Sequence, residues 1–246
     1  MERQCRPLVS VLAEIPDPRS RQGRRHPLPA VLTLACVAML CGYQSYGAIA
    51  EWARNYGRRW ARAVGLTHPT PPCAATLHTI LRTLDRTQVD AVLGAWAEEV
   101  VAALAPAGHE LEGVAMDGKT LRGSRQHGVP GAHLLAAVSQ RLGLTLGQTA
   151  VGAKTNEIPC AETLLAGLVL EGRVFTMDAL LTQRAIATTI VAGGGDYVMV
   201  VKPNQPQLYA DIQTVFATPP SSSPPPAPPP KPATRGTAGS NGGSSR

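Results

Sequence analysis

Gly113-Val114-Ala115-Met116-Asp117-Gly118-Lys119 is an apolar run that ends in an acidic turn. A second stretch, Arg173-Val174-Phe175-Thr176-Met177-Asp178-Ala179, repeats this arrangement further along the chain. Both runs are short, apolar and bounded by turn residues, which is typical of buried strands. If these strands are parallel neighbours, Asp117 and Asp178 end at one edge of a sheet, where open α/β sheets place their ligands. The sequence therefore predicts an α/β fold with two acids at one edge.

The two acids also predict a chemistry. Two carboxylates that lie close together, with no basic partner of their own, repel each other unless a cation lies between them. Carboxylate oxygens are ligands of hard divalent cations, which serve phosphodiester chemistry. Asp117 and Asp178 are therefore candidate catalytic residues and metal ligands. Taken singly, Asp117-Gly118 is also explained as a polar turn and Asp178 as an acid at a helix start.

The order of elements around the two acids indicates the topology. Three strands are followed by helix, strand, helix, strand and helix, which predicts a mixed sheet with an antiparallel opening and parallel crossovers. In the ribonuclease H-like (RNase H-like) arrangement of this order, the first and fourth strands are parallel neighbours. The predicted strands are Gly113–Met116, His133–Ser139, Leu144–Val151, Val174–Met177 and Tyr197–Val201, and the helices are Pro159–Leu170, Thr182–Ala192 and Gln207–Phe216.

The residues before this sheet predict an all-α N-terminal domain. After an Arg- and Pro-rich start, helical patterns cover Leu28–Cys41, Ser45–Tyr56, Ala74–Leu84 and Thr87–Leu104. Ser45 is suited to cap the second helix, and Thr87 with Asp90 resembles the start of a capping box. From Ala217 onward the composition is Pro, Ser and Gly, which predicts disorder. We expect a helical domain over 1–108, a partial RNase H-like domain over 109–216 and a disordered tail over 217–246.

Charge is distributed unevenly. The net charge is +6, and residues 1–72 hold ten Arg, no Lys and four acidic residues, whereas basic and acidic residues cancel in 73–246. The whole positive excess therefore lies in the N-terminal third, which favours an anionic partner there and makes Arg24 and Arg25 candidate contacts to it. A solvated basic surface is the alternative explanation.

Cysteine spacing and hydropathy indicate the compartment. The five cysteines form no CxxC pair, and no histidine stands at zinc-ligand spacing from a cysteine pair, so a reducing cytoplasm is the simplest interpretation. Leu28–Cys41 is a long apolar run, but as a helix it spans only about 21 Å, short of the roughly 30 Å hydrocarbon core. We expect a buried helix there and no membrane partner.

Three loops carry basic and amide side chains that would reach the acidic edge. Such side chains are suited to hold phosphate groups, although a solvated loop explains each of them as well. These candidate phosphate contacts are Lys119 and Arg122 after the first strand, Lys154 and Asn156 before the first crossover helix, and Lys202 and Asn204 after the last strand.

Seven stretches together resemble a known family. They are Ile15-Pro16-Asp17-Pro18-Arg19, Gly23-Arg24-Arg25-His26-Pro27-Leu28, Ala48-Ile49-Ala50-Glu51-Trp52-Ala53, Asp117–Ser124, Lys154–Ile158, Thr176-Met177-Asp178-Ala179, and Asp196-Tyr197 with Lys202-Pro203-Asn204-Gln205. In this order they are similar to the H-repeat-associated insertion-sequence transposases, which are bacterial DDE enzymes with an RNase H-like core. The resemblance covers about residues 8–216. Each motif is short, and the specificity lies in finding all seven in register.

The resemblance implies DNA cleavage and strand transfer at element ends, with three acids holding Mg²⁺ or Mn²⁺. It implies element ends and target DNA as partners, which makes the basic and amide residues named above candidate DNA contacts. A cytoplasmic, nucleoid-associated location follows from it, and a homo-oligomer of the chain is a candidate further assembly. Asp117 and Asp178 match the first two acids of the family.

The family's third acid, a Glu, is expected well past the Asn204-Gln205 loop. No Glu follows Glu171, and the only acid after Asp196 is Asp211, which does not match the family position. We therefore expect a C-terminally truncated and catalytically impaired transposase. A DNA-binding transposase fragment without catalysis and a metal-dependent nuclease on a similar sheet are the two alternatives. Metal-dependent strand transfer on cognate ends separates them.

Overall fold

The computed structural model describes residues 5–105, 111–124, 131–152 and 156–217, and it gives only the backbone of residues 58–60 and 122. Two compact units divide the chain, residues 1–201 and residues 202–246, and each is described by itself. The predicted disordered tail over 217–246 lies, beyond Ala217, outside the described residues.

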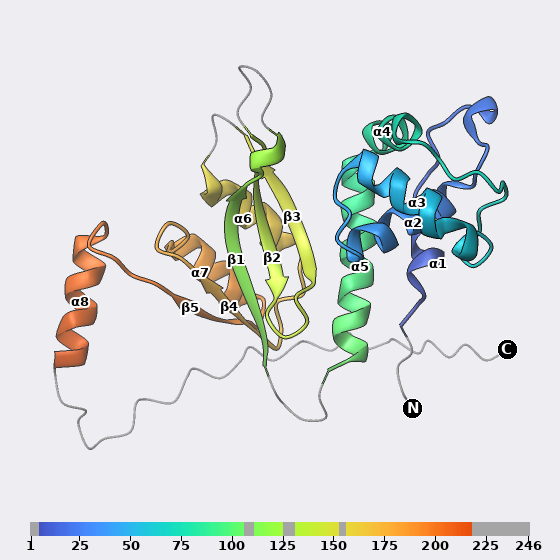
Figure 1. The fold of residues 1–246 in the computed structure, drawn as a ribbon. Coiled ribbons are helices and arrows are strands. Elements are labelled where there is room, and N and C mark those ends of the chain that lie inside the picture. Colours follow the sequence, from blue (N-terminus) through green and yellow to red (C-terminus); the bar gives the residue numbers. More distant parts are fainter. Residues whose placement is uncertain (1–4, 106–110, 125–130, 153–155, 218–246) are drawn as a thin grey trace, which may run out of the picture. The chain divides into compact units, whose positions relative to one another are not determined.

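The first part of the chain is helical, as predicted (Figure 1). The four predicted helices are present with ends shifted by a few residues, and a short helix precedes them. Ser45 caps α3 as expected, because its side chain accepts a hydrogen bond from the Ala48 amide at 3.1 Å. The helices are α1 (Leu8–Leu12), α2 (Leu28–Leu40), α3 (Tyr46–Trp60), α4 (Ala74–Thr83) and α5 (Arg86–Ala103), with a 3₁₀ turn, η1, at Arg21–Gly23.

The start of α5 corrects one expectation. Asp85, and not Thr87, is the N-cap, because the Asp85 carboxylate accepts a hydrogen bond from the Thr87 amide at 2.9 Å. Thr87 therefore lies inside the helix. An Asp two residues before the expected cap gives the same stabilisation of free backbone N–H groups, and the sequence pattern did not distinguish the two.

The apolar run at Leu28–Leu40 is a core helix. Leu34 and Ala38 are fully buried, and α2 packs with α1 and α3 into the helical core. A helix that is apolar on most of its surface is expected to be covered on several sides. Among the described residues, no helix has both the length and the hydropathy needed to cross a membrane.

The second part of the first unit is a mixed sheet of five strands in the order β3-β2-β1-β4-β5. The pairs β1–β2 and β2–β3 are antiparallel, whereas β1–β4 and β4–β5 are parallel. This is the RNase H-like order that the sequence predicts, with β1 and β4 as parallel neighbours. The strands are β1 (Glu112–Thr120), β2 (His133–Ser139), β3 (Thr145–Val151), β4 (Arg173–Met177) and β5 (Asp196–Met199).

Two crossover helices cover the sheet (Figure 1). Helix α6 (Glu157–Ala166) packs on β2 and β3, and α7 (Arg184–Ala192) packs beside α6 and on β5. Their buried side chains join Phe175 and Leu135 in a second core. A 3₁₀ turn, η2 (Arg122–Ser124), follows β1. Helix α8 (Pro206–Ala217) belongs to the second unit and has no fully buried residue.

Helix α5 contributes to both cores. Val92 and Leu93 pack against the helical core, whereas Ala97 and Val101 belong to the sheet core. Between them, Gly94 allows close approach to β3, because a Cβ atom there would lie 2.8 Å from the backbone oxygen of Leu146. The end of the helical part is thus built into the sheet.

Several element ends differ from the expectation: α6 ends at Ala166 rather than Leu170, and α7 begins at Arg184 rather than Thr182. Strand β1 continues to Thr120, because Lys119 and Thr120 pair with Leu134 and His133 of β2. The expected turn at Asp117 is therefore extended strand. Helix α6 begins at Glu157 rather than at Pro159, because Asn156 caps it.

Candidate functional site

Asp117 and Asp178 lie at equivalent places on neighbouring parallel strands. The last residues that pair β1 with β4 are Met116 and Met177, and each Asp follows directly. Both Met side chains are buried in the sheet core, whereas both acids are exposed. The sequence prediction of two acids at one sheet edge therefore agrees with the register, and their catalytic role stays a prediction.

The Asp178 carboxylate is held by the turn that follows β4. Its Oδ1 accepts a hydrogen bond from the Leu180 amide at 3.1 Å. The hydroxyl of buried Thr182 lies 3.1 Å from the Asp178 carbonyl oxygen and 2.8 Å from that of Val200, which fixes the turn against the segment after β5. This arrangement leaves Oδ2 available to a cation.

The Asp117 carboxylate has no hydrogen-bond or ion-pair partner in the part of the chain that the structure describes. Lys119 lies two residues further along β1, and side chains alternate across a strand, so Lys119 stands on the same face as Asp117. Lys119 is exposed. One strand face thus carries an acid able to bind a cation next to an ammonium group able to bind a phosphate.

The donor set fits a hard divalent cation. Two exposed carboxylates supply oxygen ligands of the kind that Mg²⁺ accepts beside several waters. Within the described ranges, no three His, Cys, Asp or Glu side chains come close enough together to hold a metal ion. The candidate site therefore has two protein carboxylates, and among the described residues the third acid that the family resemblance implies has no counterpart beside them.

A hydrogen-bonded chain beside Asp117 was not predicted from the sequence. The Glu157 Oε1 lies 2.6 Å from His133 Nε2, and His133 Nδ1 lies 2.9 Å from the Thr120 hydroxyl. Glu157 stands within the Lys154–Ile158 motif, but its sequence position predicted no role for it. His133 and Thr120 meet because β2 pairs with β1, and no spacing in the sequence indicates this contact.

The loop residues proposed as DNA contacts have different outcomes. Asn156 is exposed, but its Oδ1 accepts a hydrogen bond from the Ile158 amide at 3.2 Å as the cap of α6. Lys202 and Asn204 are exposed in the second unit. Lys154 lies outside the described residues, as does the side chain of Arg122.

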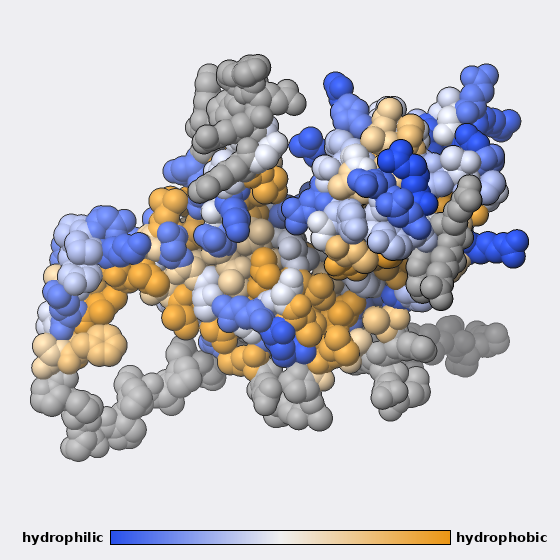
Figure 2. All heavy atoms as spheres, viewed as in Figure 1, coloured by the Kyte–Doolittle hydropathy of each residue, from blue (hydrophilic) through white to orange (hydrophobic). Residues whose placement is uncertain are grey.

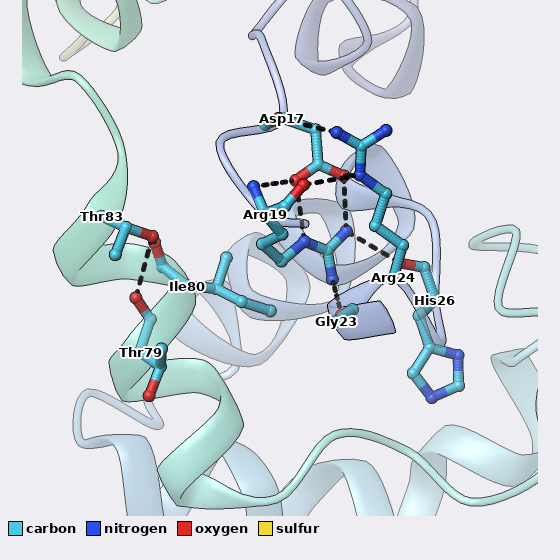
Figure 3. A network of polar contacts seen from close by, with 8 residues as sticks. All are labelled: Asp17, Arg19, Gly23, Arg24, His26, Thr79, Ile80 and Thr83. Carbon is cyan, nitrogen blue, oxygen red and sulfur yellow. Dashed lines mark hydrogen bonds and ion pairs between the residues drawn. The ribbon is translucent and has the colours of Figure 1, made fainter. Parts of the chain in front are cut away.

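In the N-terminal segment, arginines make internal contacts (Figure 3). The Arg19 guanidinium donates to both carboxylate oxygens of Asp17 at 2.8 Å and to the His26 carbonyl oxygen at 2.9 Å. The Arg19 side chain is 9% exposed. These bonds from Arg19 hold the pKa of Asp17 below its ordinary value. These contacts of Arg19 therefore stabilise the folded conformation of residues 17–26.

Arg24 and Arg25, the two predicted DNA contacts, are partly used in the same way. Arg24 donates to the backbone oxygen of Arg19 at 2.9 Å, and its Nε lies 3.4 Å from an Asp17 carboxylate oxygen. Arg25 Nη2 lies 2.6 Å from His68 Nε2. Both side chains remain exposed, so their other donors can still face a phosphate.

Further arginines are not engaged. Arg21, Arg54 and Arg62 are exposed, and their side chains have no hydrogen bond or ion pair with any residue that the structure describes. Many hydrophilic side chains stand on the surface of this helical part in the view of Figure 2. An open hollow of about 490 Å³ also lies between residues 18–23 and α4. The uneven charge of the sequence predicted a basic N-terminal third, but it did not single out these three arginines.

A mixed sheet of this order, with carboxylates at the ends of two adjacent parallel strands, defines an RNase H-like domain of the kind that nucleic-acid enzymes use. The family described as "Transposase DDE domain" matches residues 108–232, and the family described as "DDE_Tnp_1-associated" matches residues 9–97. The chain belongs to the DDE transposase family.

Relatives agree with this assignment. The "Putative transposase YncI" of Escherichia coli K12 is 30% identical over 214 residues, covering 85% of this chain and 83% of that protein. An "Uncharacterized protein in dhlA 3'region" of Xanthobacter autotrophicus is 32% identical over 206 residues, 83% of this chain and 68% of that protein. The "H repeat-associated putative transposase YhhI" of E. coli K12 is 26% identical, and the match spans 53% of its length. The two transposase names support the family that the sequence motifs suggest.

A solved structure of the piggyBac transposase synaptic complex with hairpin DNA is similar at a TM-score of 0.38 and 13% identity, covering 89% of this chain and 52% of that chain. At this score the likeness adds nothing to the assignment.

Proposed function

We propose that this chain binds DNA and a divalent cation, Mg²⁺ or Mn²⁺, as a DDE-type insertion-sequence transposase, with Asp117 and Asp178 as the metal ligands. The observation that carries this proposal is the register of β1 and β4, which puts both acids one residue beyond the same strand pair. Membership of the DDE transposase family supports the same chemistry.

The bound metal would polarise a phosphate oxygen and lower the pKa of an attacking water. The protein's own residues would hold the two carboxylates and a lysine in position. Asp178 is oriented by the Leu180 amide, and Asp117 projects from a strand that β2 and β4 hold on both sides up to Met116. Lys119, on the same strand face as Asp117, would bind the phosphate next to the scissile bond.

DNA binding is proposed for the helical part, as domain 1–108. Several of its arginines are exposed and unengaged, among them Arg21, Arg54 and Arg62, and these can contact backbone phosphates. Two separate hydrophobic cores support a boundary near residue 108, although α5 enters both. Domain 109–216 would then carry the metal site.

One observation favours the alternative of DNA binding without strand transfer. The described residues bring two carboxylates to the edge and no third, and two-metal phosphoryl transfer normally needs further oxygen ligands. We therefore propose weak metal binding and little or no transposition by this chain alone.

The test combines purified chain, Mn²⁺ or Mg²⁺, and DNA duplexes that carry the element's terminal repeats. We expect specific binding of the ends in a gel-shift assay, with cleavage absent or at trace level. Asp117→Asn should abolish any trace cleavage and leave DNA binding intact, because Asp117 lies outside the helical part that carries the unengaged arginines.

The cleavage result distinguishes an active transposase from a chain that binds DNA without strand transfer. Efficient, end-specific cleavage that Asp117→Asn abolishes would overturn the proposed impairment and require a third ligand from Asp211 or a second chain. Cleavage that survives both Asp117→Asn and Asp178→Asn would overturn the assigned metal site.

A further inference from the structure

A clamp of three side chains holds β1 beside Asp117. Thr120 of β1, His133 of β2 and Glu157 of α6 form one hydrogen-bonded chain, with 2.9 Å between Thr120 Oγ1 and His133 Nδ1 and 2.6 Å between His133 Nε2 and Glu157 Oε1. A carboxylate only accepts hydrogen bonds, so Nε2 carries the proton toward Glu157. In the neutral ring, Nδ1 then accepts a hydrogen bond from the Thr120 hydroxyl group. Three elements are joined at one point.

Glu157 is also seated directly on Gly118, the residue after Asp117. A Cβ atom at Gly118 would lie 2.6 Å from Glu157 Cδ and 2.9 Å from Oε2, which is closer than atoms can pack. The glycine therefore leaves the space that the Glu157 carboxyl group fills. The Glu157 side chain is 16% exposed and that of His133 is 29% exposed, so water competes little for the pair.

The clamp acts where the sheet gives β1 the least support. Pairing with β4 ends at Met116, so residues 117–120 of β1 pair only with β2 within the described chain. On the side of β4, no strand of the described chain fixes the backbone that carries Asp117. Contact with Glu157 on α6 supplies a second support for this segment.

The two faces of β1 separate the clamp from the metal ligands. Gly118 lies on the same strand face as buried Met116, and Asp117 projects from the opposite face. Glu157 thus packs behind the strand. We infer that Glu157, held by His133, is a positioning residue that keeps Asp117 in register with Asp178 for a divalent cation, without itself binding the cation.

This inference rests on the proposed metal site, and metal affinity tests it. Mn²⁺ binding to the full chain is measured by the electron paramagnetic resonance signal of free Mn²⁺. Glu157→Ala should weaken binding about fivefold or more, because the segment after Met116 loses its second support. Glu157→Gln should bind within about twofold of the original chain, because the amide oxygen still accepts the His133 Nε2 proton.

Gly118→Ala provides an independent variant. Its Cβ displaces the Glu157 carboxyl group, so we expect the same loss of affinity as for Glu157→Ala. When Gly118→Ala and Glu157→Ala are combined, the two losses of Mn²⁺ affinity should not add, because the methyl group added at Gly118 then meets no carboxyl group. His133→Asn should weaken binding in the same direction.

Glu112→Ala is the matched control. Glu112 stands at the other end of β1, where it accepts hydrogen bonds from Ser139 at 2.5 Å and Arg141 at 2.9 Å. Its replacement removes a comparable polar interaction of the same strand, and Mn²⁺ affinity should not change.

Three results would overturn the inference. Unchanged affinity in Glu157→Ala and Gly118→Ala would show that the clamp does not affect the metal site. Equal losses in Glu157→Gln and Glu157→Ala would make the Glu157 charge the requirement and Glu157 a direct ligand. A loss of Mn²⁺ affinity in Glu112→Ala as large as in Glu157→Ala would show that the loss reflects lower stability of β1 and not the position of Asp117. Failure of the proposed function looks different, because Asp117→Asn would then bind Mn²⁺ like the original chain.

Discussion

Arg173, at the first position of β4, is buried and forms a two-pronged ion pair with Glu98 of α5. Arg173 Nη1 donates to Glu98 Oε1 at 2.9 Å, and Nη2 donates to Oε2. The Arg173 side chain is 7% exposed and that of Glu98 is 24% exposed. The pair therefore ties the last helix of the helical part to the strand that directly precedes Asp178.

We predict that Glu98→Ala lowers the free energy of unfolding by about 2 kcal/mol, because it leaves a buried guanidinium without its partner. Urea unfolding followed by circular dichroism measures the change. Glu99→Ala is the matched control, since Glu99 is the next residue of the same helix and its partner Arg6 is exposed. It should have little effect. Equal stability of the two variants would contradict the prediction.

The Asp17–Arg19 contact predicts a second difference. Arg19→Lys should lower stability by about 1–2 kcal/mol, because a lysine cannot make the bidentate contact to Asp17 and also reach the His26 carbonyl oxygen. Arg21→Lys, two residues away and exposed, should be neutral. Thermal unfolding of both variants checks this. A neutral Arg19→Lys would show that the network in Figure 3 does not stabilise the fold.

Acidification should destabilise the helical part through His26. Burial lowers the pKa of His26 below its ordinary value of 6.5, and its Nδ1 is buried without a hydrogen-bond partner among the described residues. The folded state thus favours the neutral ring, so this stability is present above about pH 6.5 and is lost as the pH falls through the lowered pKa.

Urea unfolding between pH 7 and pH 5 tests this dependence. His26→Gln keeps a donor for the Thr70 carbonyl oxygen, which accepts from His26 Nε2 at 3.0 Å, and should flatten the pH profile. His78→Gln, at an exposed position, should leave the profile unchanged. A profile that is the same with and without His26 would exclude this residue as the cause.

DNA affinity should depend on the free arginines of the helical part. Replacing Arg21, Arg54 and Arg62 by Gln should weaken DNA binding and reduce the slope of log affinity against log salt by about 0.9 for each phosphate that the variant no longer neutralises. Arg184→Gln, at the exposed start of α7, is the control. Unchanged affinity and slope in the triple variant would move the DNA surface elsewhere.

Local patterns predict much of this fold. Short apolar runs bounded by turn residues predicted all five strands, and the order of elements predicted that β1 and β4 are parallel neighbours, which placed Asp117 and Asp178 at one edge. The sequence also predicted a buried helix at Leu28–Cys41, observed over Leu28–Leu40, and the cap at Ser45. These features depend on neighbouring residues or on general rules of connection.

The rest depends on contacts between distant residues. The extension of β1 to Thr120 depends on pairing with His133 of β2. The contact between the Glu157 carboxyl group and Gly118 depends on how α6 is placed over β1. The internal use of Arg24 and Arg25 follows from a folded loop that no periodicity describes. The expected C-terminal truncation stays a prediction.

The central claim is that Asp117 and Asp178 share a divalent cation, and Mn²⁺ affinity tests it most directly. Asp117→Asn and Asp178→Asn should each weaken Mn²⁺ binding at least about tenfold, or ~1.4 kcal/mol, because each removes one charged ligand. Asp196→Asn, an exposed acid at the opposite end of the parallel strands, should bind like the original chain. If either variant at Asp117 or Asp178 bound Mn²⁺ as tightly as Asp196→Asn does, the shared site would be contradicted.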